Sequence, residues 1–366
     1  MDSEFSRNRF GDPKLLERHR RFWHREEMDR PLVGVLVDRM FPLHSFQPSR
    51  DNATVVPSDV TEEWFTQECE RRYRASQQTG GDALFVAYAG IGLPWIEGIL
   101  GCEVRVQSGT GWAEPLSGEW KTFDGDSVQW TNGWFEKMQH LTHLAAQTGA
   151  GRYPVGPAHM RSPIDLAWTL VGAQQLCLII YDQPAELGNL LDVLVAAWIK
   201  AVEAQFTLLP TYDGGYWNGN QPLWAPGKSM FITADAASVL SPKALGKFVL
   251  PDIARIVKGL DYSILHTHSS HQHIVDLAMD IEELRAIQVG IDDKGQQDAV
   301  SSLIPQFRKI QERKALIVGI TEQDVDKAVL QARTVLGEIS PRGLCILSYL
   351  PTAEDGMRFL TSLKDT

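Results

Sequence analysis

Four of the ten histidines in this chain fall within eight residues, at His266, His268, His271 and His273. The first two follow a short apolar run at 262–265. Because alternate residues of a β-strand share a face, we expect the imidazoles of His266 and His268 to project together. Two neighbouring imidazoles at a strand end could bind a metal ion, move protons or hold an anion. We therefore place the chemistry here, and expect His271 and His273 to face solvent.

Other candidate side chains lie at strand ends or in long loops. Asp235 closes an apolar strand, where an unpaired carboxylate is costly to bury, so it is a candidate general acid or base or substrate anchor. A capping or ion-paired aspartate is its ordinary alternative. Arg161 could bind a carboxylate and Asp165 a cation, or the two could form an internal ion pair. Asp292 and Asp293 mark another strand end. Further candidates for substrate binding are Trp95, Glu97, Trp217, Trp224 and the inward-pointing Gln288.

The elements that must position these residues repeat in order: an apolar run, a polar or Gly/Pro loop, then an amphipathic helix. Eight strands alternating with helices predict a (β/α)8 TIM-like barrel, with its site at the carboxyl ends of the strands. A doubly wound open sheet is the alternative, although no GxGxxG motif follows the first strand. The expected strands cover 33–37, 83–88, 152–155, 230–233, 262–266, 286–289, 315–319 and 343–347.

Two long segments interrupt this alternation, 90–130 after the second strand and 212–224 before the fourth. Both are rich in tryptophan and glycine, and long ordered loops of barrels are often functional. We expect a pocket wall or lid, with a plain hairpin or a subunit contact as the equal alternative. No linker divides the chain, so 1–366 is expected to form one domain, with 1–30 as a helical extension.

Composition excludes several classes of protein. With 43% apolar and 22% charged residues, the chain has the average make-up of a soluble globular protein. A net charge of −11 argues against nucleic-acid binding, which needs a basic face. No apolar run approaches the roughly 20 residues that span a membrane. The four cysteines form no CxxC pair and the N-terminus shows no signal pattern, so a cytoplasmic location is expected.

Several motifs resemble the uroporphyrinogen decarboxylase superfamily. The block DAASVLSP at 235–242, followed by FVLP at 248–251, is similar to the superfamily segment in which a strand delivers an acidic residue and Leu-Ser-Pro opens a helix. The resemblance covers nearly the whole chain and implies a TIM-like barrel with its site at the carboxyl face. Supporting segments are DRP at 29–31, ILGC at 99–102, RSPIDL at 161–166 and YDQP at 181–184.

Within this superfamily the corrinoid-dependent methyltransferases are the more similar branch. They carry His-x-Cys at a strand end and a late cysteine, which together hold zinc and activate a thiol. Here the resemblance implies zinc ligands at His266 and His268, with Cys345, Asp235 or Glu322 as the third. The decarboxylases' own late Gly-His pair has no counterpart in Leu-Ser-Tyr at 347–349, which argues against uroporphyrinogen as the substrate.

The leading hypothesis is a methyltransferase in which zinc assists transfer between a corrinoid and a small acceptor such as a thiol. The methylated corrinoid would be carried by a separate protein, and a homodimer is one candidate assembly. The alternative enzyme is a metal-free decarboxylase or lyase on a small acid, with Asp235, His266 and His268 moving protons and Arg161 holding the carboxylate. A ligand-binding barrel without catalysis is the third hypothesis.

Overall fold

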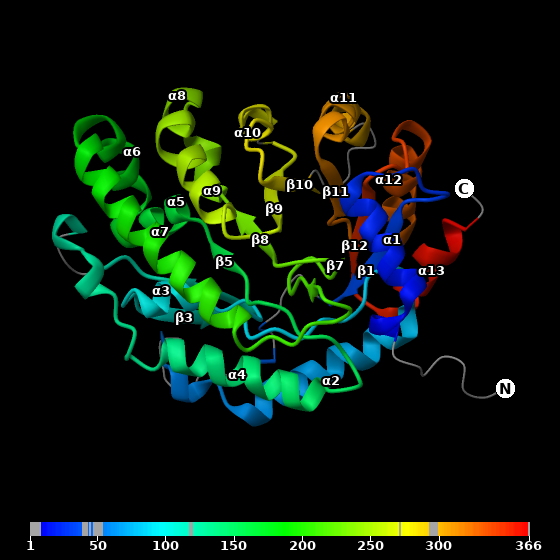
Figure 1. Ribbon diagram of the computed structural model, residues 1–366, viewed down its shortest axis with the longest axis horizontal. Coiled ribbons are helices and arrows are strands. Elements are labelled where there is room, and N and C mark those ends of the chain that lie inside the picture. Colours follow the sequence, from blue (N-terminus) through cyan, green and yellow to red (C-terminus); the bar gives the residue numbers. More distant parts are fainter. Residues whose placement is uncertain are drawn as a thin grey trace.

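The computed structural model describes residues 9–38, 43, 45–46, 54–116, 120–270, 272–292 and 299–364. A seven-stranded sheet, parallel throughout, lies at its centre with helices outside it (Figure 1). In spatial order its strands are β1 (Leu32–Val37), β12 (Leu344–Leu350), β11 (Ala315–Ile320), β10 (Leu284–Ile291), β9 (Tyr262–His268), β8 (Ser229–Thr233) and β5 (Met160–Arg161). The main outer helices are α2 (Glu62–Thr79), α4 (Trp134–Gly149), α7 (Pro184–Phe206), α9 (Leu250–Val257), α10 (Gln272–Ala278), α11 (Ala299–Arg313), α12 (Val325–Glu338) and α13 (Ala353–Ser362).

Both faces of the sheet are covered by other parts of the chain. Side chains on both faces of a strand are therefore buried, which explains why the strands are continuous apolar runs in the sequence. Every residue of β11, for example, is buried, as expected of a parallel strand packed on two sides. Alternation along the strands separates two cores. Residues under the helices form the larger one, and the inner one contains Phe231, Ile264, Ala286, Ile317 and Leu347. Polar residues at the carboxyl ends of the same inner rows therefore also project inward.

The predicted α/β class and six of the eight expected strands are confirmed, but the closed eight-stranded barrel is not. The expected strands 83–88 and 152–155 make a single parallel bridge, Ala87 to Val155, and the sheet is not closed. Pro154 and Pro157 flank this bridge and have no N–H to donate, so a regular ladder cannot continue through them. What remains is two hydrogen bonds, from Ala87 N to Pro154 O and from Gly156 N to Ala87 O, both 2.9 Å.

Both long segments contain regular structure. The first forms α3 (Trp95–Ile99), β3 (Val104–Gln107) and β4 (Thr110–Ala113), and these two strands make a small antiparallel sheet with β2 (Thr54–Val55), which comes earlier in the chain. The second forms the hairpin of β6 (Tyr216–Trp217) and β7 (Trp224–Ala225). Leu223 and Ala225 belong to the inner core, and Gln221 Nε2 donates to the Tyr349 hydroxyl over 3.2 Å. The hairpin therefore fills the interior of the sheet.

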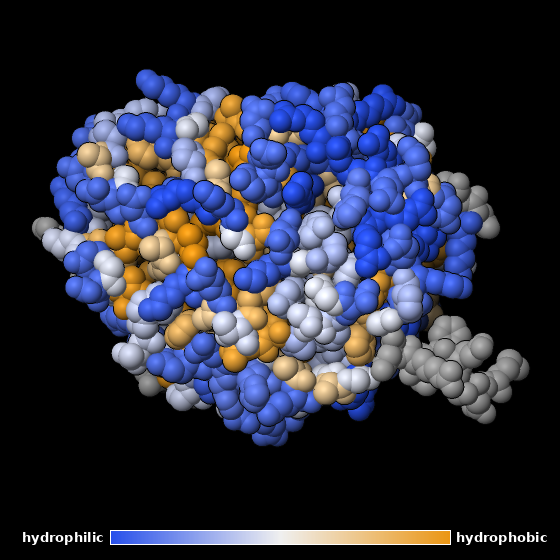
Figure 2. All heavy atoms as spheres, in the orientation of Figure 1, coloured by the Kyte–Doolittle hydropathy of each residue, from blue (hydrophilic) through white to orange (hydrophobic). Residues whose placement is uncertain are grey.

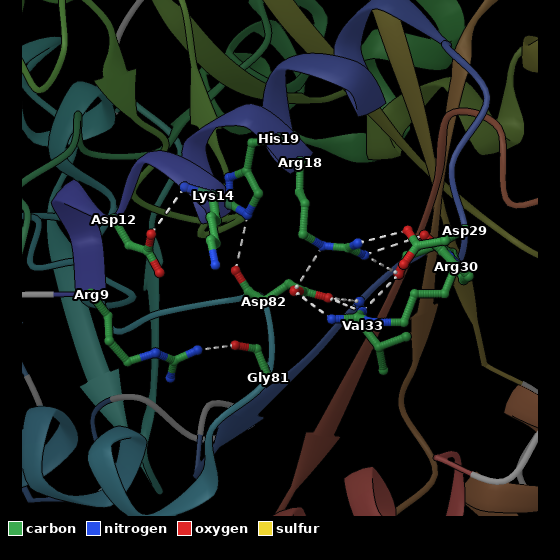
Figure 3. A network of polar contacts seen from close by, with 11 residues as sticks. Arg9, Asp12, Lys14, Arg18, His19, Asp29, Arg30, Val33, Gly81 and Asp82 are labelled. Atoms are coloured by element: carbon green, nitrogen blue, oxygen red, sulfur yellow. Dashed lines mark hydrogen bonds and ion pairs between the residues drawn. The ribbon is translucent and has the colours of Figure 1, made fainter. Parts of the chain in front are cut away.

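Helix α1 (Pro13–His24) lies within the expected N-terminal extension, of which residues 1–8 fall outside the described part of the chain. The buried carboxylate of Asp82 ties the end of this region to the sheet (Figure 3). It accepts a two-pronged hydrogen bond from Arg30, at 2.6 and 3.1 Å, and one from Val33 N at 2.9 Å. Arg18 of α1 adds an ion pair at 3.4 Å. One carboxylate thus links α1, β1 and the segment after α2.

His19 of α1 is fully buried and uses both ring nitrogens. Nδ1 accepts from Trp224 N at 2.8 Å, and Nε2 donates to Asp82 O at 3.0 Å. Because burial disfavours the charged ring, the pKa of His19 falls to about 4 from its ordinary 6.5. The single Nδ1 lone pair that accepts from Trp224 is lost on protonation.

The His19 arrangement predicts a loss of stability in acid. A folded-state pKa below the unfolded value gives stability that is complete above pH 6.5 and is lost as pH falls toward about 4. The full difference amounts to about 3 kcal/mol. Urea unfolding at pH 7 and pH 5 should show about 2 kcal/mol of this loss, and His19→Gln should lower the number of protons taken up on unfolding in this range by about one. An unchanged slope in that variant would contradict a neutral, buried His19.

The surface is mixed in polarity. On the face in Figure 2, hydrophilic side chains dominate on the side of α1, α11 and α12, and hydrophobic ones gather on the side of α7 and α9. No single helix in the described ranges is long and apolar enough to cross a membrane. The consecutive helices α5 (Pro163–Val171) and α6 (Ala173–Asp182), bent by 108°, meet that test of length and composition only as a pair.

Candidate active site

His266 and His268 lie at the carboxyl end of β9, in the inner row that begins with Ile264. Their Nε2 atoms are 3.2 Å apart, and the rings meet edge to face with centroids 4.6 Å apart. Both side chains are partly exposed, with a third of the His268 side chain accessible. The pair is therefore open to a small solute and is not sealed into the core.

Asp235 joins this pair from the neighbouring strand. It begins the 3₁₀ turn Asp235–Val239 directly after β8, which pairs with β9. Its Oδ1 lies 3.6 Å from His268 Nε2. The three residues each offer a ligand atom, and these atoms lie within 4.8 Å of one another. In the described part of the chain, no other group of three or more His, Cys, Asp or Glu side chains meets this spacing.

Two residues from β10 and its end hold the imidazoles from behind. Gln288 stands opposite His266 in the strand register, and its Oε1 accepts a hydrogen bond from His266 Nδ1. His268 Nδ1 donates to Asp292 Oδ2 over 2.6 Å. Both contacts use Nδ1 and leave the Nε2 atoms facing each other and Asp235. Gln288, expected in substrate binding, is placed against His266, and Asp293 lies outside the described residues.

The charges of the cluster are strongly coupled. Hydrogen bonds to Asp235 and then Asp292 raise the pKa of His268 to about 10. Burial opposes ionisation of Asp235, but the hydrogen bond from His268 and the nearby positive charges outweigh it and lower its pKa to about 2. Burial lowers the pKa of His266. Without a metal, His268 is therefore cationic and lies between the carboxylates of Asp235 and Asp292, beside a neutral His266.

Asp165 fixes the turn that carries Asp235. Its buried carboxylate accepts hydrogen bonds from Thr233 Oγ1 at 3.1 Å and Ala236 N at 2.8 Å. Burial and the charge of Asp235 raise its pKa. Arg161 has its nearest ion-pair contact with Glu97, from Nη1 to Oε1 at 3.6 Å. Burial raises the pKa of the Glu97 carboxyl, which is 1% exposed.

A cavity of about 290 Å³ lies near the cluster, and although Asp235, His266 and His268 do not line it, its wall residues His159 and Arg161 interact electrostatically with Asp235. Among its walls are Trp95, Glu97 and Arg161, three of the residues expected to bind substrate. The ring of His159 links cavity and cluster, since it lies 5.4 Å from the ring of Phe231, which lies 5.4 Å from that of His266. The other lining residues are Tyr88, Gly90, Gly92, Leu93, Pro94, Gly111, Trp112, Asn220 and Tyr349.

His159 and Tyr349 are site residues that the sequence analysis missed. His159 Nε2 is buried without a hydrogen-bond partner, and burial lowers the pKa of the ring to about 4. An unsatisfied ring nitrogen in a cavity wall is suited to a polar group of a ligand. One signal was available, because His159 stands two residues before Arg161 and so shares its side of an extended segment.

Trp217 and Trp224, also expected to bind substrate, are not brought to this cavity. Both are fully buried in the hairpin, around His19 of α1. The Trp217 ring packs edge to face on His19 at 5.3 Å, and Trp224 Nε1 donates to Tyr212 O over 2.7 Å. The hairpin precedes β8, so these rings lie toward the amino ends of the strands. Their observed role is packing.

Cys345 does not join the histidines either. It pairs in register with Leu32 and Ile317 near the start of β12, and it is fully buried in the inner core. Burial raises the pKa of its thiol well above the ordinary value, which opposes the thiolate form that binds zinc. Glu322 instead accepts from Asp324 N at 2.9 Å, in the turn before α12. Of the three candidate third ligands, Asp235 is the one beside the pair.

His140, His143 and His273 do not belong to the cluster. His140 and His143 are exposed on α4, where His140 pairs with Glu62 at 2.7 Å and His143 with Gln147 at 2.9 Å. His273 Nε2 contacts Ala237 O at 3.4 Å. His271 falls outside the described residues.

Comparison with known proteins bears on the fold. No family model and no curated protein matches the chain. Among solved structures, the chain is similar to a methyltransferase from Methanosarcina mazei, with a TM-score of 0.67 and 13% sequence identity. The match covers 95% of this chain and 97% of that one. At such low identity, the likeness shows a shared fold over nearly the full length.

Proposed function

We propose that the protein is a methyltransferase that uses a zinc ion held by Asp235, His266 and His268. The observation that carries this proposal is the convergence of three ligand atoms within 4.8 Å, with both Nδ1 atoms engaged elsewhere. Zinc in catalytic sites commonly takes three protein ligands of this N and O type and keeps one position open. The partly exposed cluster near a cavity is suited to such an open position.

The surrounding residues fit a metal site. Metal-binding histidines usually donate their other ring N–H to a carboxylate or carbonyl, as His268 does to Asp292 and His266 to Gln288. A bound zinc ion would supply a positive charge that deprotonates a thiol or water near neutral pH. In this site Asp165 would hold the turn of Asp235, while Arg161, Glu97 and the aromatic walls would hold and orient the small substrate.

Two likenesses support methyl transfer in particular. The sequence motifs resemble a superfamily that includes corrinoid-dependent methyltransferases, and a solved methyltransferase has the same fold. We propose a methylated corrinoid on a separate protein as the donor and a small thiol as the acceptor. The sulfur–carbon bond would form as the carbon–cobalt bond breaks, with its electron pair left on cobalt.

Methyl transfer is tested with tag-free protein, methylcobalamin and a panel of small thiols. Loss of the carbon–cobalt bond is followed by visible absorbance. We expect thiol-dependent demethylation that is abolished in His266→Ala/His268→Ala and retained in His143→Ala, whose side chain is exposed on α4. Identical rates in the double variant and the wild type would contradict the proposal.

One observation favours a second candidate, a metal-free lyase or decarboxylase. The positive charge at the cluster can also come from a proton on His268. With a pKa of about 10, His268 is cationic at neutral pH and can act as a general acid. Arg161 would then hold the substrate carboxylate. Turnover of a small carboxylic acid that chelators leave unchanged would favour this candidate over the first.

Replacing Asp292 tests a residue that positions the ligand His268 without itself binding the metal. We expect Asp292→Asn to weaken zinc binding about 10- to 100-fold, because the charged acceptor behind His268 is lost while the three ligands remain. Competition with a chromogenic chelator measures the affinity. Asp276→Asn is the matched control, since that exposed carboxylate pairs only with Lys309 among the described residues. Equal affinities in both variants would exclude a role for Asp292.

A further inference from the structure

A second cavity lies at the opposite ends of the strands from the histidine pair. It has a volume of about 410 Å³ and is formed by the start of β9, the start of β10, the end of α11 and the end of α1. This cavity therefore shares no residue with the proposed methyl-transfer site. Its lining residues are Trp23, His24, Arg25, Tyr262, Glu282, Leu284, Arg285, Arg313 and Lys314.

The charge of this cavity is opposite to that of the chain. Four of its lining residues are basic, namely Arg25, Arg285, Arg313 and Lys314, and Glu282 is the one acidic residue in the wall. The chain as a whole has a net charge of −11. Positive charges gathered in a concave site repel one another, and they raise the local concentration of anions.

Carboxylates do not neutralise most of these charges. Lys314 Nζ donates to Ile281 O over 2.6 Å, and Arg25 Nη1 donates to Gln311 O over 3.0 Å. Carbonyl oxygens satisfy the hydrogen bonds but carry no net charge. Arg313 pairs with Asp280 at 2.7 Å, whereas Arg285 has no hydrogen-bond or ion-pair partner in the described ranges.

The basic side chains are also held in place. Arg25 ends α1 with a left-handed backbone (φ 51°), and its carbonyl accepts a hydrogen bond from Arg342 Nε at 2.5 Å. Lys314 is 6% exposed and fixed between the carbonyls of Ile281 and Glu282. The site therefore presents positive charge from anchored groups, with Arg285 free to close on a ligand. Anchored donors lose little conformational entropy on binding.

We propose that this cavity binds a compact multivalent anion of the diphosphate class. Its charged ends would be held by the four basic residues that line the cavity, Arg25, Arg285, Arg313 and Lys314. Guanidinium groups suit such a ligand because their donors match phosphate oxygens in pairs. Trp23 and Tyr262, with rings 5.2 Å apart, form the apolar wall.

Isothermal titration calorimetry with sodium pyrophosphate tests the site. We expect saturable binding of one pyrophosphate per chain, weakening as salt is raised. Arg285→Gln should weaken it about tenfold or more, because a charged hydrogen-bonding group is lost. Arg308→Gln is the matched control, since Arg308 lies on α11, which also contributes Arg313 to the cavity, but pairs with Glu338 outside the cavity. The affinity of the Arg308→Gln variant for pyrophosphate should equal that of the wild type.

A metal ion could itself bind pyrophosphate, so the titration is repeated with His266→Ala/His268→Ala. Binding retained in this variant and weakened in Arg285→Gln supports the basic cavity, whatever the outcome of the methyl-transfer test. Absence of saturable binding, or equal affinity in Arg285→Gln and the wild type, overturns the proposal. Melting curves of each variant without ligand establish that the fold is intact.

Discussion

His266→Ala is expected to weaken zinc binding at least a hundredfold. The imidazole supplies one of three ligand atoms that lie within 4.8 Å of one another, and no other His, Cys, Asp or Glu in the described residues joins that group. Loss of a residue that merely supports a ligand already costs 10- to 100-fold, so loss of a ligand itself should cost more. Competition with a chelator of known affinity measures the change.

The fold should survive this substitution. His266 is partly exposed, and its hydrogen bond to Gln288 involves one side chain on the adjacent strand. His143→Ala provides the control for removal of an exposed imidazole. If His266→Ala bound zinc as tightly as His143→Ala, the metal would have to lie elsewhere in the protein.

Asp82→Ala is expected to destabilise the fold by about 3 kcal/mol. The substitution removes the acceptor of the two hydrogen bonds from Arg30 and of one from Val33 N, and leaves the Arg18 guanidinium without its buried counter-charge. The value lies at the lower end for a buried ion pair because the Arg30 side chain is 53% exposed and can be hydrated. Urea unfolding followed by tryptophan fluorescence measures it.

Asp29→Ala is the matched control for Asp82. Asp29 also pairs with Arg18, at 3.0 Å, but its side chain is 76% exposed. Exposed pairs contribute about 0–1 kcal/mol, so its loss should be small. Equal effects of the two substitutions would show that burial of the Asp82 carboxylate is not what stabilises this junction.

The position of the histidine pair and of Asp235 could be predicted because period-two alternation and the parallel order of strands are local rules. His266 and His268 share a face by spacing alone, and Asp235 follows the strand next to theirs. The open edge of the sheet could not be predicted from the apolar pattern of 83–88 and 152–155. There the missing N–H groups of Pro154 and Pro157 outweigh strand propensity.

The structure places three predicted site residues, Trp217, Trp224 and Cys345, outside the site, and the reasons can be identified. Trp217 and Trp224 precede β8 and pack with Leu15 and Leu16 of α1, and only the tip of their hairpin, at Asn220, reaches the cavity. Cys345 was placed near the end of a strand expected to stop at residue 347, whereas β12 continues to Leu350. This difference of three residues moves Cys345 into the core, and it is Tyr349 that reaches the cavity.

X-ray absorption spectroscopy of the zinc-loaded protein reports the ligand atoms themselves and so distinguishes a site at Asp235, His266 and His268 from one that includes a cysteine. We predict a shell of nitrogen and oxygen atoms at about 2.0–2.1 Å with imidazole scattering and no sulfur. The imidazole signal should fall in His266→Ala. A sulfur shell at about 2.3 Å would instead show a cysteine among the ligands and exclude the Asp235, His266 and His268 site. Failure to retain zinc at all would favour acid–base chemistry by His268 and Asp235.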